Sequence, residues 1–205
     1  MRFRQRTGRN ERGAAMVEMA LVMPILLMLV FGIIEFGLAF QSRLTIGNAT
    51  QSAARVGSAI GTGDRADIEI LRALEQGLFQ LPSNGKDIIK EVWIYKATAD
   101  GSPASSCSGS ACNVYTYNPL LACNWSPCPD PDSPPAVYGG GWDPASRNAT
   151  IGTLDVLGVD IYFSHTWIVG SFLPLADVPC TNPPNGCWSD TALMRLEPQQ
   201  FGLGG

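Results

Sequence analysis

One apolar run dominates the first quarter of the chain. Between Met19 and Ile34 no residue is charged, and apolar flanks carry the run on to Phe40. Because an α-helix rises about 1.5 Å per residue, this run can cross a hydrocarbon core of roughly 30 Å. The pattern therefore predicts a transmembrane helix over residues 14–40.

The helical pattern continues beyond the apolar run. Residues 40–60 are rich in alanine, glutamine, arginine and serine and contain no proline, so we expect one helix from about Ala14 to Ile60. Small residues recur four positions apart on one face, at Ala49, Ala53, Gly57 and Gly61. Such a stripe lets a second helix approach closely. The sequence leaves open whether that neighbour belongs to another subunit or to the chain's own domain.

A second, amphipathic helix is predicted from about Asp64 to Leu81. Asp64, with Asp67 three positions later, resembles an N-terminal helix cap. Apolar residues then recur at helical spacing, at Ile68, Leu71, Leu74 and Leu78. Charged residues flank this stripe, so we expect it to lie on a core.

Period-two alternation replaces the helical spacing after Pro82. It predicts a small antiparallel sheet with strands at Asp87–Ala97, Leu157–Trp167 and Thr191–Glu197, and a further strand at Asn113–Tyr117. In Leu157–Trp167 the alternation indicates one buried face. Helices that are followed by strands are typical of the α+β class.

The basic residues are unequally distributed around the apolar run. Five arginines precede it, whereas only Arg43 and Arg55 lie in the comparable stretch after it. Since positive charge is retained in the cytoplasm, we expect a single-pass membrane protein with a cytoplasmic N-terminus. Residues 1–13 form a basic leader that ends at the flexible Gly13, and residues 41–205 form an extracytoplasmic domain.

All six cysteines lie in the segment that we place outside the cytoplasm. They are Cys107, Cys112, Cys123, Cys128, Cys180 and Cys187. Their even number and exported position favour disulfides over zinc, because no C-x-x-C is present and the chain has a single histidine. Sequence neighbours close short loops that contain proline, glycine or serine, so we expect local pairs, 107 with 112, 123 with 128 and 180 with 187, which staple the long loops.

No pattern in the chain indicates an enzyme. The sequence has no G-x-S-x-G, Walker or H-E-x-x-H motif. His165 and its neighbour Ser164 would point to opposite faces of a strand, so they cannot meet as base and nucleophile. The Gly139–Gly141 run is a weak phosphate-binding pattern, and Asp130 with Asp132 fits a solvated turn better than a calcium site. We expect no catalytic residue, no metal and no cofactor.

The charge balance argues against nucleic-acid binding. Without the five arginines and the one glutamate ahead of Gly13, the chain carries 9 basic and 17 acidic residues, a net charge of −8. A nucleic-acid interface needs a basic surface instead.

Two carboxylates lie near the ends of the apolar run, Glu18 and Glu35. A charged group at bilayer depth costs on the order of 2.5–3.5 kcal/mol on insertion scales, so a simple anchor would not retain them. Glu35 lies about 25 Å further along the helix axis than Glu18 and is expected near the outer interface.

Gly13, with Glu18 as the fifth residue after it and an apolar helix beyond, resembles the processing signal of type IV prepilins. The wider string RGAAMVEMALVMPILLMLVFGIIEFG is similar to the TadE-like pseudopilins of the tight-adherence (Flp) pilus system, and the resemblance covers about residues 12–60. Ala192–Pro198 resembles the closing strand of that family. Met19 stands where Flp-type processing sites commonly have tyrosine.

The resemblance implies a structural, non-enzymatic pseudopilin or minor pilin that assists assembly of a Flp-type pilus for surface adherence or secretion. It implies that a prepilin peptidase cuts between Gly13 and Ala14, and that Glu18 then pairs with the new amino group of a neighbouring subunit. The partners would be the membrane, the peptidase, other pilin or pseudopilin subunits and the assembly machinery. The alternative is a single-pass anchor that carries an extracytoplasmic ligand-binding or enzymatic domain.

Overall fold

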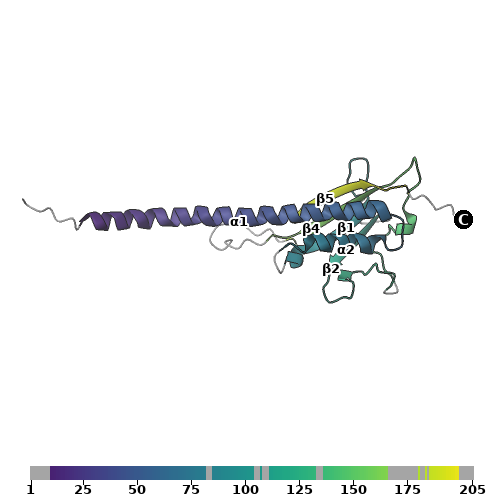
Figure 1. The fold of residues 1–205 in the computed structure, drawn as a ribbon, viewed down its shortest axis with the longest axis horizontal. Helices are drawn as coiled ribbons and strands as arrows, with labels where there is room; N and C mark the ends of the chain where they lie inside the picture. Colours follow the sequence, from purple (N-terminus) through teal and green to yellow (C-terminus); the bar gives the residue numbers. More distant parts are fainter. Residues whose placement is uncertain are drawn as a thin grey trace, which may run out of the picture.

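The computed structural model shows one long helix that runs into a small α+β domain (Figure 1). The structure describes residues 10–81, 85–103, 107, 111–132, 136–165, 180, 183 and 185–198. It confirms the α+β class with a long N-terminal helix, a second helix and an antiparallel sheet. Most of the basic leader, residues 1–9, lies outside the described residues.

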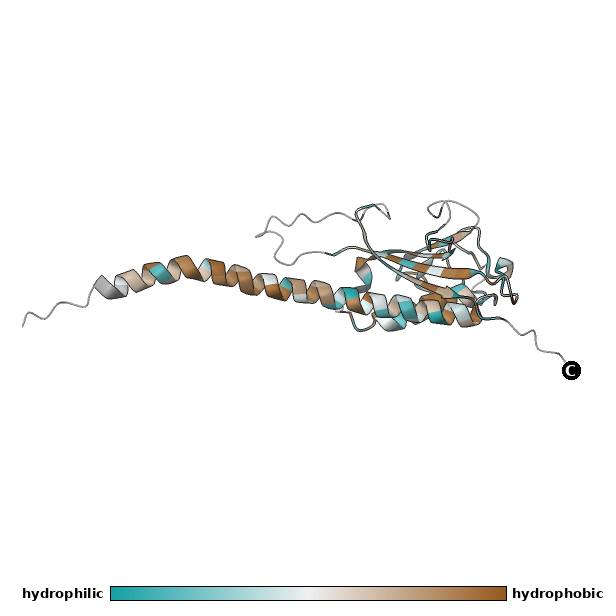
Figure 2. Cartoon of the chain, turned by 90° about the horizontal axis from the view of Figure 1, so that it is seen from above, coloured by the Kyte–Doolittle hydropathy of each residue, from teal (hydrophilic) through white to brown (hydrophobic). Residues whose placement is uncertain are grey.

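The long helix α1 spans Asn10–Ile60 and thus begins ahead of the expected start at Ala14. Asparagine favours a helix start, and alanines 14 and 15 are strong helix formers, so the helix extends back through Gly13. Pro24 lies inside α1 without ending it. Figure 2 shows the hydrophobic residues concentrated in the N-terminal half of α1, away from the domain.

α2 spans Ala66–Leu78 and runs back along the C-terminal part of α1 (Figure 1). It is shorter at both ends than the expected Asp64–Leu81, but its predicted apolar stripe is buried. The predicted cap is wrong, because Arg65 takes the N-cap position and makes no side-chain cap hydrogen bond. Asp67 is buried instead, and its carboxylate accepts hydrogen bonds from Asn113 of β2 and from Arg147 of the segment between β3 and β4.

The sheet has the strand order β3-β2-β1-β4-β5, and every neighbouring pair is antiparallel. The strands are β1 Ile89–Lys96, β2 Cys112–Tyr117, β3 Trp125–Ser126, β4 Val156–Phe163 and β5 Trp188–Arg195. The 3₁₀ turn η1 Gly85–Ile88 precedes β1, and η3 Pro144–Ser146 precedes β4. All four predicted strands are present, with shifted ends.

The ends of β4 and β5 differ from the sequence prediction for identifiable reasons. β4 ends at Phe163, so His165 lies beyond the strand, and the expected end at Trp167 lies outside the described residues. β5 begins at Trp188, because residues 188–190 pair with Phe163–Ile161 of β4. It ends at Arg195, because the next two amides donate to other segments: Leu196 to the Asp155 carbonyl and Glu197 to the Ser58 carbonyl.

Both faces of β4 are buried, which corrects the expectation of one buried face. One face packs under α1 and α2, where Val159 and Ile161 join the main core. The other face forms a small cluster in which Tyr162 lies against Trp93, with ring centroids 4.6 Å apart. The segment after β1 covers this second face, since the Tyr95 hydroxyl donates to the Gly101 carbonyl at 3.1 Å.

The six cysteines form the three local pairs that their spacing predicts. Their Cα separations are 5.1 Å for Cys107–Cys112, 6.1 Å for Cys123–Cys128 and 4.5 Å for Cys180–Cys187. The paired cysteines are only five, five and seven positions apart in the sequence, so each disulfide stiffens a short loop. Cys112, Cys107 and Cys187 also pack in the small cluster on the second face of the sheet.

Candidate functional site

The N-terminal half of α1 is an exposed apolar cylinder. Its large apolar side chains from Met16 to Ile34 are all exposed, with 73% exposure at Met16 and at Ile33. Among the described residues, α1 is the one helix long and apolar enough to cross a membrane. An exposed apolar surface of this size is typical of a segment that contacts lipid or other apolar helices.

The residues of the expected processing signal lie at the start of this cylinder. Gly13, Ala14 and Glu18 are exposed, and a Cβ added at Gly13 would meet nothing within 4 Å. Glu18 is four residues after Ala14, so both lie on the same helix face, about 6 Å apart along the axis. Among the residues that the structure describes, none from the domain covers this face.

Glu35 has a different environment from Glu18. Its side chain is 3% exposed, and its Oε1 lies 3.8 Å from Nε2 of His165, just past the end of β4. His165 in turn stacks on Trp188 at the start of β5, with ring centroids 5.3 Å apart. The structure thus separates the two carboxylates by role: Glu18 faces outward, and Glu35 joins α1 to the domain.

The small-residue stripe of α1 packs against the chain's own domain. A Cβ added at Gly77 of α2 would lie 2.5 Å from Cβ of Ala49, and one added at Gly57 would lie 2.4 Å from Leu157. Gly61 is in contact with Leu196, and Ala53 is fully buried. The sequence left open whether the stripe contacts another subunit or the chain's own domain. In the structure it contacts the chain's own domain.

A buried polar cluster joins the long loop between β3 and β4 to α2, and the sequence did not predict it. Arg147 forms an ion pair with Asp67, and both side chains are fully buried. Asn113 Nδ2 and the Tyr115 hydroxyl donate to the same carboxylate at 2.8 and 2.6 Å. Burial, and then the charge of Asp67, raises the pKa of Tyr115. The available signal was a lone aspartate on the apolar face of α2.

Arg147 is held from two further sides. It donates to the Gly61 carbonyl at 3.2 Å, where α1 ends, and its guanidinium lies 4.4 Å from the ring centre of Trp142. One side chain from the loop thereby contacts the end of α1, α2 and its own loop. The cluster has the chemistry of a structural clamp, because its polar groups bond to one another within the core.

A second buried carboxylate lies on the outer face of the sheet. Asp160 accepts hydrogen bonds from the Tyr95 hydroxyl at 2.9 Å and from the Tyr162 hydroxyl at 3.3 Å. Burial raises the pKa of Asp160 despite these bonds. Burial and the charge of Asp160 raise the pKa of both tyrosines, so they remain protonated donors at neutral pH.

The two weak ligand-binding patterns have structural explanations. Gly139–Gly141 runs beside β2, where the Val114 amide donates to the Gly139 carbonyl at 3.3 Å, and a Cβ at Gly139 would collide with the Val114 carbonyl. Asp130 and Asp132 form ion pairs with Arg72 and Arg65 of the α2 region. Among the described residues, no group of three or more histidine, cysteine, aspartate or glutamate side chains is placed to hold a metal ion.

Comparison with known proteins places the similarity in α1. The family model described as TadE-like protein matches residues 13–55, which begin at Gly13 and end inside the part of α1 that packs on the domain. No curated protein and no solved structure matches the chain. TadE-like proteins are associated with pili. The similarity to the TadE-like family thus belongs to the segment from residue 13 to residue 55.

Proposed function

We propose that the chain is a structural, non-enzymatic pseudopilin or minor pilin that takes part in the assembly of a Flp-type pilus for surface adherence or secretion. One observation carries this proposal: the apolar half of α1 extends away from the domain, with Gly13 and Glu18 exposed at its start. A helix that is apolar on all sides is suited first to lipid and then to packing among other apolar helices. The match of this same segment to a pilus-associated family supports the proposal.

The proposal places the chain across the membrane in a defined way. Residues 1–13 are a cytoplasmic leader, residues 14–40 cross the membrane, and residues 41–205 form the extracytoplasmic domain. The excess of arginine before the apolar run supports this orientation, because positive flanks stay in the cytoplasm. Three disulfides support it as well, since they persist in oxidising compartments outside the cytoplasm.

Processing gives Glu18 its partner. Cleavage between Gly13 and Ala14 by a prepilin peptidase would remove the leader and create a new α-amino group. An unpaired carboxylate in lipid costs on the order of 2.5–3.5 kcal/mol, so Glu18 is stabilised when it pairs with the amine of a neighbouring subunit. Subunits would then enter a growing assembly in one register, with other pilin or pseudopilin subunits and the assembly machinery as partners.

The decisive experiment is to determine the N-terminus of the mature chain by mass spectrometry. We expect the wild-type chain to begin at Ala14 and Gly13→Ala to retain Met1. Gly32→Ala is the matched control, because a Cβ at either glycine would meet nothing within 4 Å. A functional chain that retains Met1 would end the pilin proposal and favour the anchored-domain alternative.

A second variant separates assembly from processing. Glu18→Ala should be cut normally and remain in the membrane, but little of it should appear in the sheared surface fraction that contains pili. Val17→Ala, at a neighbouring exposed position, is the control and should assemble as the wild type does. Normal assembly of Glu18→Ala would remove the proposed role of this carboxylate.

A further inference from the structure

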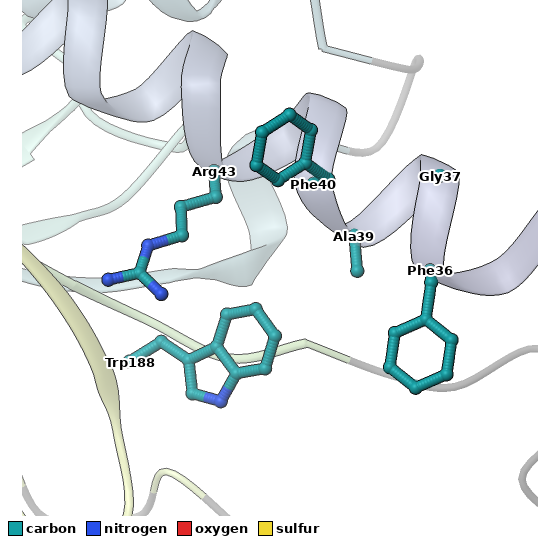
Figure 3. A pocket seen from close by; sticks show the side chains of 6 residues that line it. All are labelled: Phe36, Gly37, Ala39, Phe40, Arg43 and Trp188. Atoms are coloured by element: carbon teal, nitrogen blue, oxygen red, sulfur yellow. The ribbon is translucent and has the colours of Figure 1, made fainter.

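A hollow of about 450 Å³ lies where the exposed apolar half of α1 meets the domain. It is lined by Phe36, Gly37, Ala39, Phe40, Arg43 and Trp188. Figure 3 shows Phe36 and Arg43 extending on the same side of the helix, with the indole of Trp188 from β5 between them. We infer that this hollow seats the headgroup end of a membrane phospholipid, with Arg43 binding its phosphate. The inference rests on the proposed membrane placement of α1.

The position along α1 fits the membrane interface. Residues 14–40 extend over about 40 Å, close to the thickness of roughly 40–45 Å of a bilayer with its headgroups. Phe36 therefore falls near the outer boundary of the hydrocarbon core, Phe40 at the outer edge of the headgroups and Arg43 about one turn beyond. Helical side chains tilt towards the N-terminus, so the Arg43 side chain leans back towards the level of the lipid phosphates.

The aromatic side chains have the chemistry of an interfacial anchor. Tryptophan prefers the membrane–water boundary, where an apolar ring and a polar N–H are both satisfied. The indole of Trp188 is held in place by stacking on His165 and by an edge contact with Phe163, 6.0 Å between centroids. Phe36 and Phe40 are 61% and 65% exposed, so they continue the apolar surface of the membrane helix up to the hollow.

The charges around the hollow favour an anionic ligand on its membrane side. Among the described residues that line the hollow, Arg43 is charged and the others are apolar or glycine. Asp190 and Arg43 both line an adjacent hollow farther from the membrane. Burial raises the pKa of Asp190, and the positive charge of Arg43 lowers it. Arg43 thus has a carboxylate on one side and an apolar-walled space on the other. A phosphate joined to glycerol and acyl chains matches that space better than free phosphate, which needs no apolar walls.

The test uses the full chain in phosphatidylcholine vesicles that contain lipids brominated near the headgroup end of the acyl chains. Bromine quenches nearby tryptophan emission, and the chain has five tryptophans. We expect the Trp188→Phe substitution to reduce the amount of tryptophan emission that bromine removes by about twofold. The reason is that a tryptophan at the interface lies within reach of these lipids. Trp142→Phe is the matched control, since Trp142 is 3% exposed and lies beside Arg147 at the far end of α1. In that variant, bromine should remove as much tryptophan emission as in the wild type.

Arg43 is tested in the same vesicles against an arginine farther out on the helix. Arg43→Gln should reduce the quenching that depends on Trp188, whereas Arg55→Gln, about 18 Å farther along α1, should not. Equal quenching of wild type and Trp188→Phe in chains that resist alkaline extraction would overturn the inference and leave the proposed function intact. A Trp188 effect that appears only at high protein-to-lipid ratio would assign the hollow to a second copy and overturn it too. Chains that are removed from the vesicles by alkaline extraction would refute the inference and the membrane placement together.

Discussion

Single residues hold the long loop onto the domain, and Arg147 is the clearest of them. Its ion pair with Asp67 is fully buried, and Asn113 and Tyr115 complete the bonding of the carboxylate. A buried ion pair contributes little net free energy when intact, but removal of one partner leaves an uncompensated charge in the core. The cluster therefore specifies where the loop docks more than it stabilises the domain.

Arg147→Ala should lower the free energy of unfolding by about 3–5 kcal/mol, because Asp67 would remain buried without its cation. Denaturant titration followed by tryptophan emission measures this loss. Arg72→Ala is the control, because the Arg72 side chain, which pairs with Glu69 and Asp130, is 42% exposed. This substitution should lower the free energy of unfolding by less than about 1 kcal/mol. Similar losses for both variants would show that the buried pair has no special role.

Asp160 makes the stability depend on pH. Burial raises its pKa in the folded chain, so folding favours the protonated form, and its contribution is complete below the ordinary pKa of about 3.9. The contribution is lost as the pH rises through the raised folded value. Asp160→Asn should therefore flatten the fall in the free energy of unfolding above about pH 4.

Urea titrations at a series of pH values test this expectation. Asp190 should retain part of the dependence, because burial raises its pKa in the same direction. Asp100→Asn is the control: hydrogen bonds from Thr98 and Ser102 lower the pKa of Asp100, so its contribution has the opposite sign. A wild-type curve that Asp160→Asn does not alter would show that Asp160 titrates normally.

The decisive contact between elements is the one between α1 and α2. The two helices meet at small residues, with Gly77 of α2 facing Ala49 of α1. Close approach at this point lets both helices cover one face of the sheet and complete the main core. The stripe on α1 thus serves the domain itself, whereas the apolar N-terminal half of the same helix is exposed.

Gly77→Ala should destabilise the domain although alanine is the better helix former. The new Cβ would lie 2.7 Å from the Ala49 Cα, so the helix backbones must separate. Overpacking of this kind costs about 1–3 kcal/mol, against a gain of at most about 1 kcal/mol from helix propensity. Thermal melts in detergent should show a lower midpoint for Gly77→Ala and no decrease for Gly32→Ala, which meets open space.

In the whole molecule, α1 has two environments that meet near Glu35. On the N-terminal side every large apolar side chain is exposed, and from Glu35 and Ala39 onward one face of the same helix is buried by the domain. The proposed membrane boundary, at about residue 40, thus nearly coincides with the start of the domain. Because an unbroken helix joins them, the orientation of the domain is fixed relative to the proposed membrane span without a flexible linker (Figure 1).

The sequence by itself determined those features that depend on neighbouring residues. The apolar run predicted α1, because helix length and hydropathy are local properties, and short spacings predicted the three cysteine pairs for the same reason. Alternation located the strands, since the side-chain period belongs to the strand alone. The α+β class followed from the order of these elements.

Only the tertiary structure decided what depends on residues far apart in the chain. Asp67 is a clamp residue and no helix cap, because Arg147 reaches it across the fold. The neighbour of the small-residue stripe is α2, because the turn after Ile60 folds that helix back. β4 is buried on both faces and β5 ends at Arg195 through contacts with segments that no local pattern reveals. Such contacts form only when the chain closes on itself, so their partners are absent from any short window of sequence.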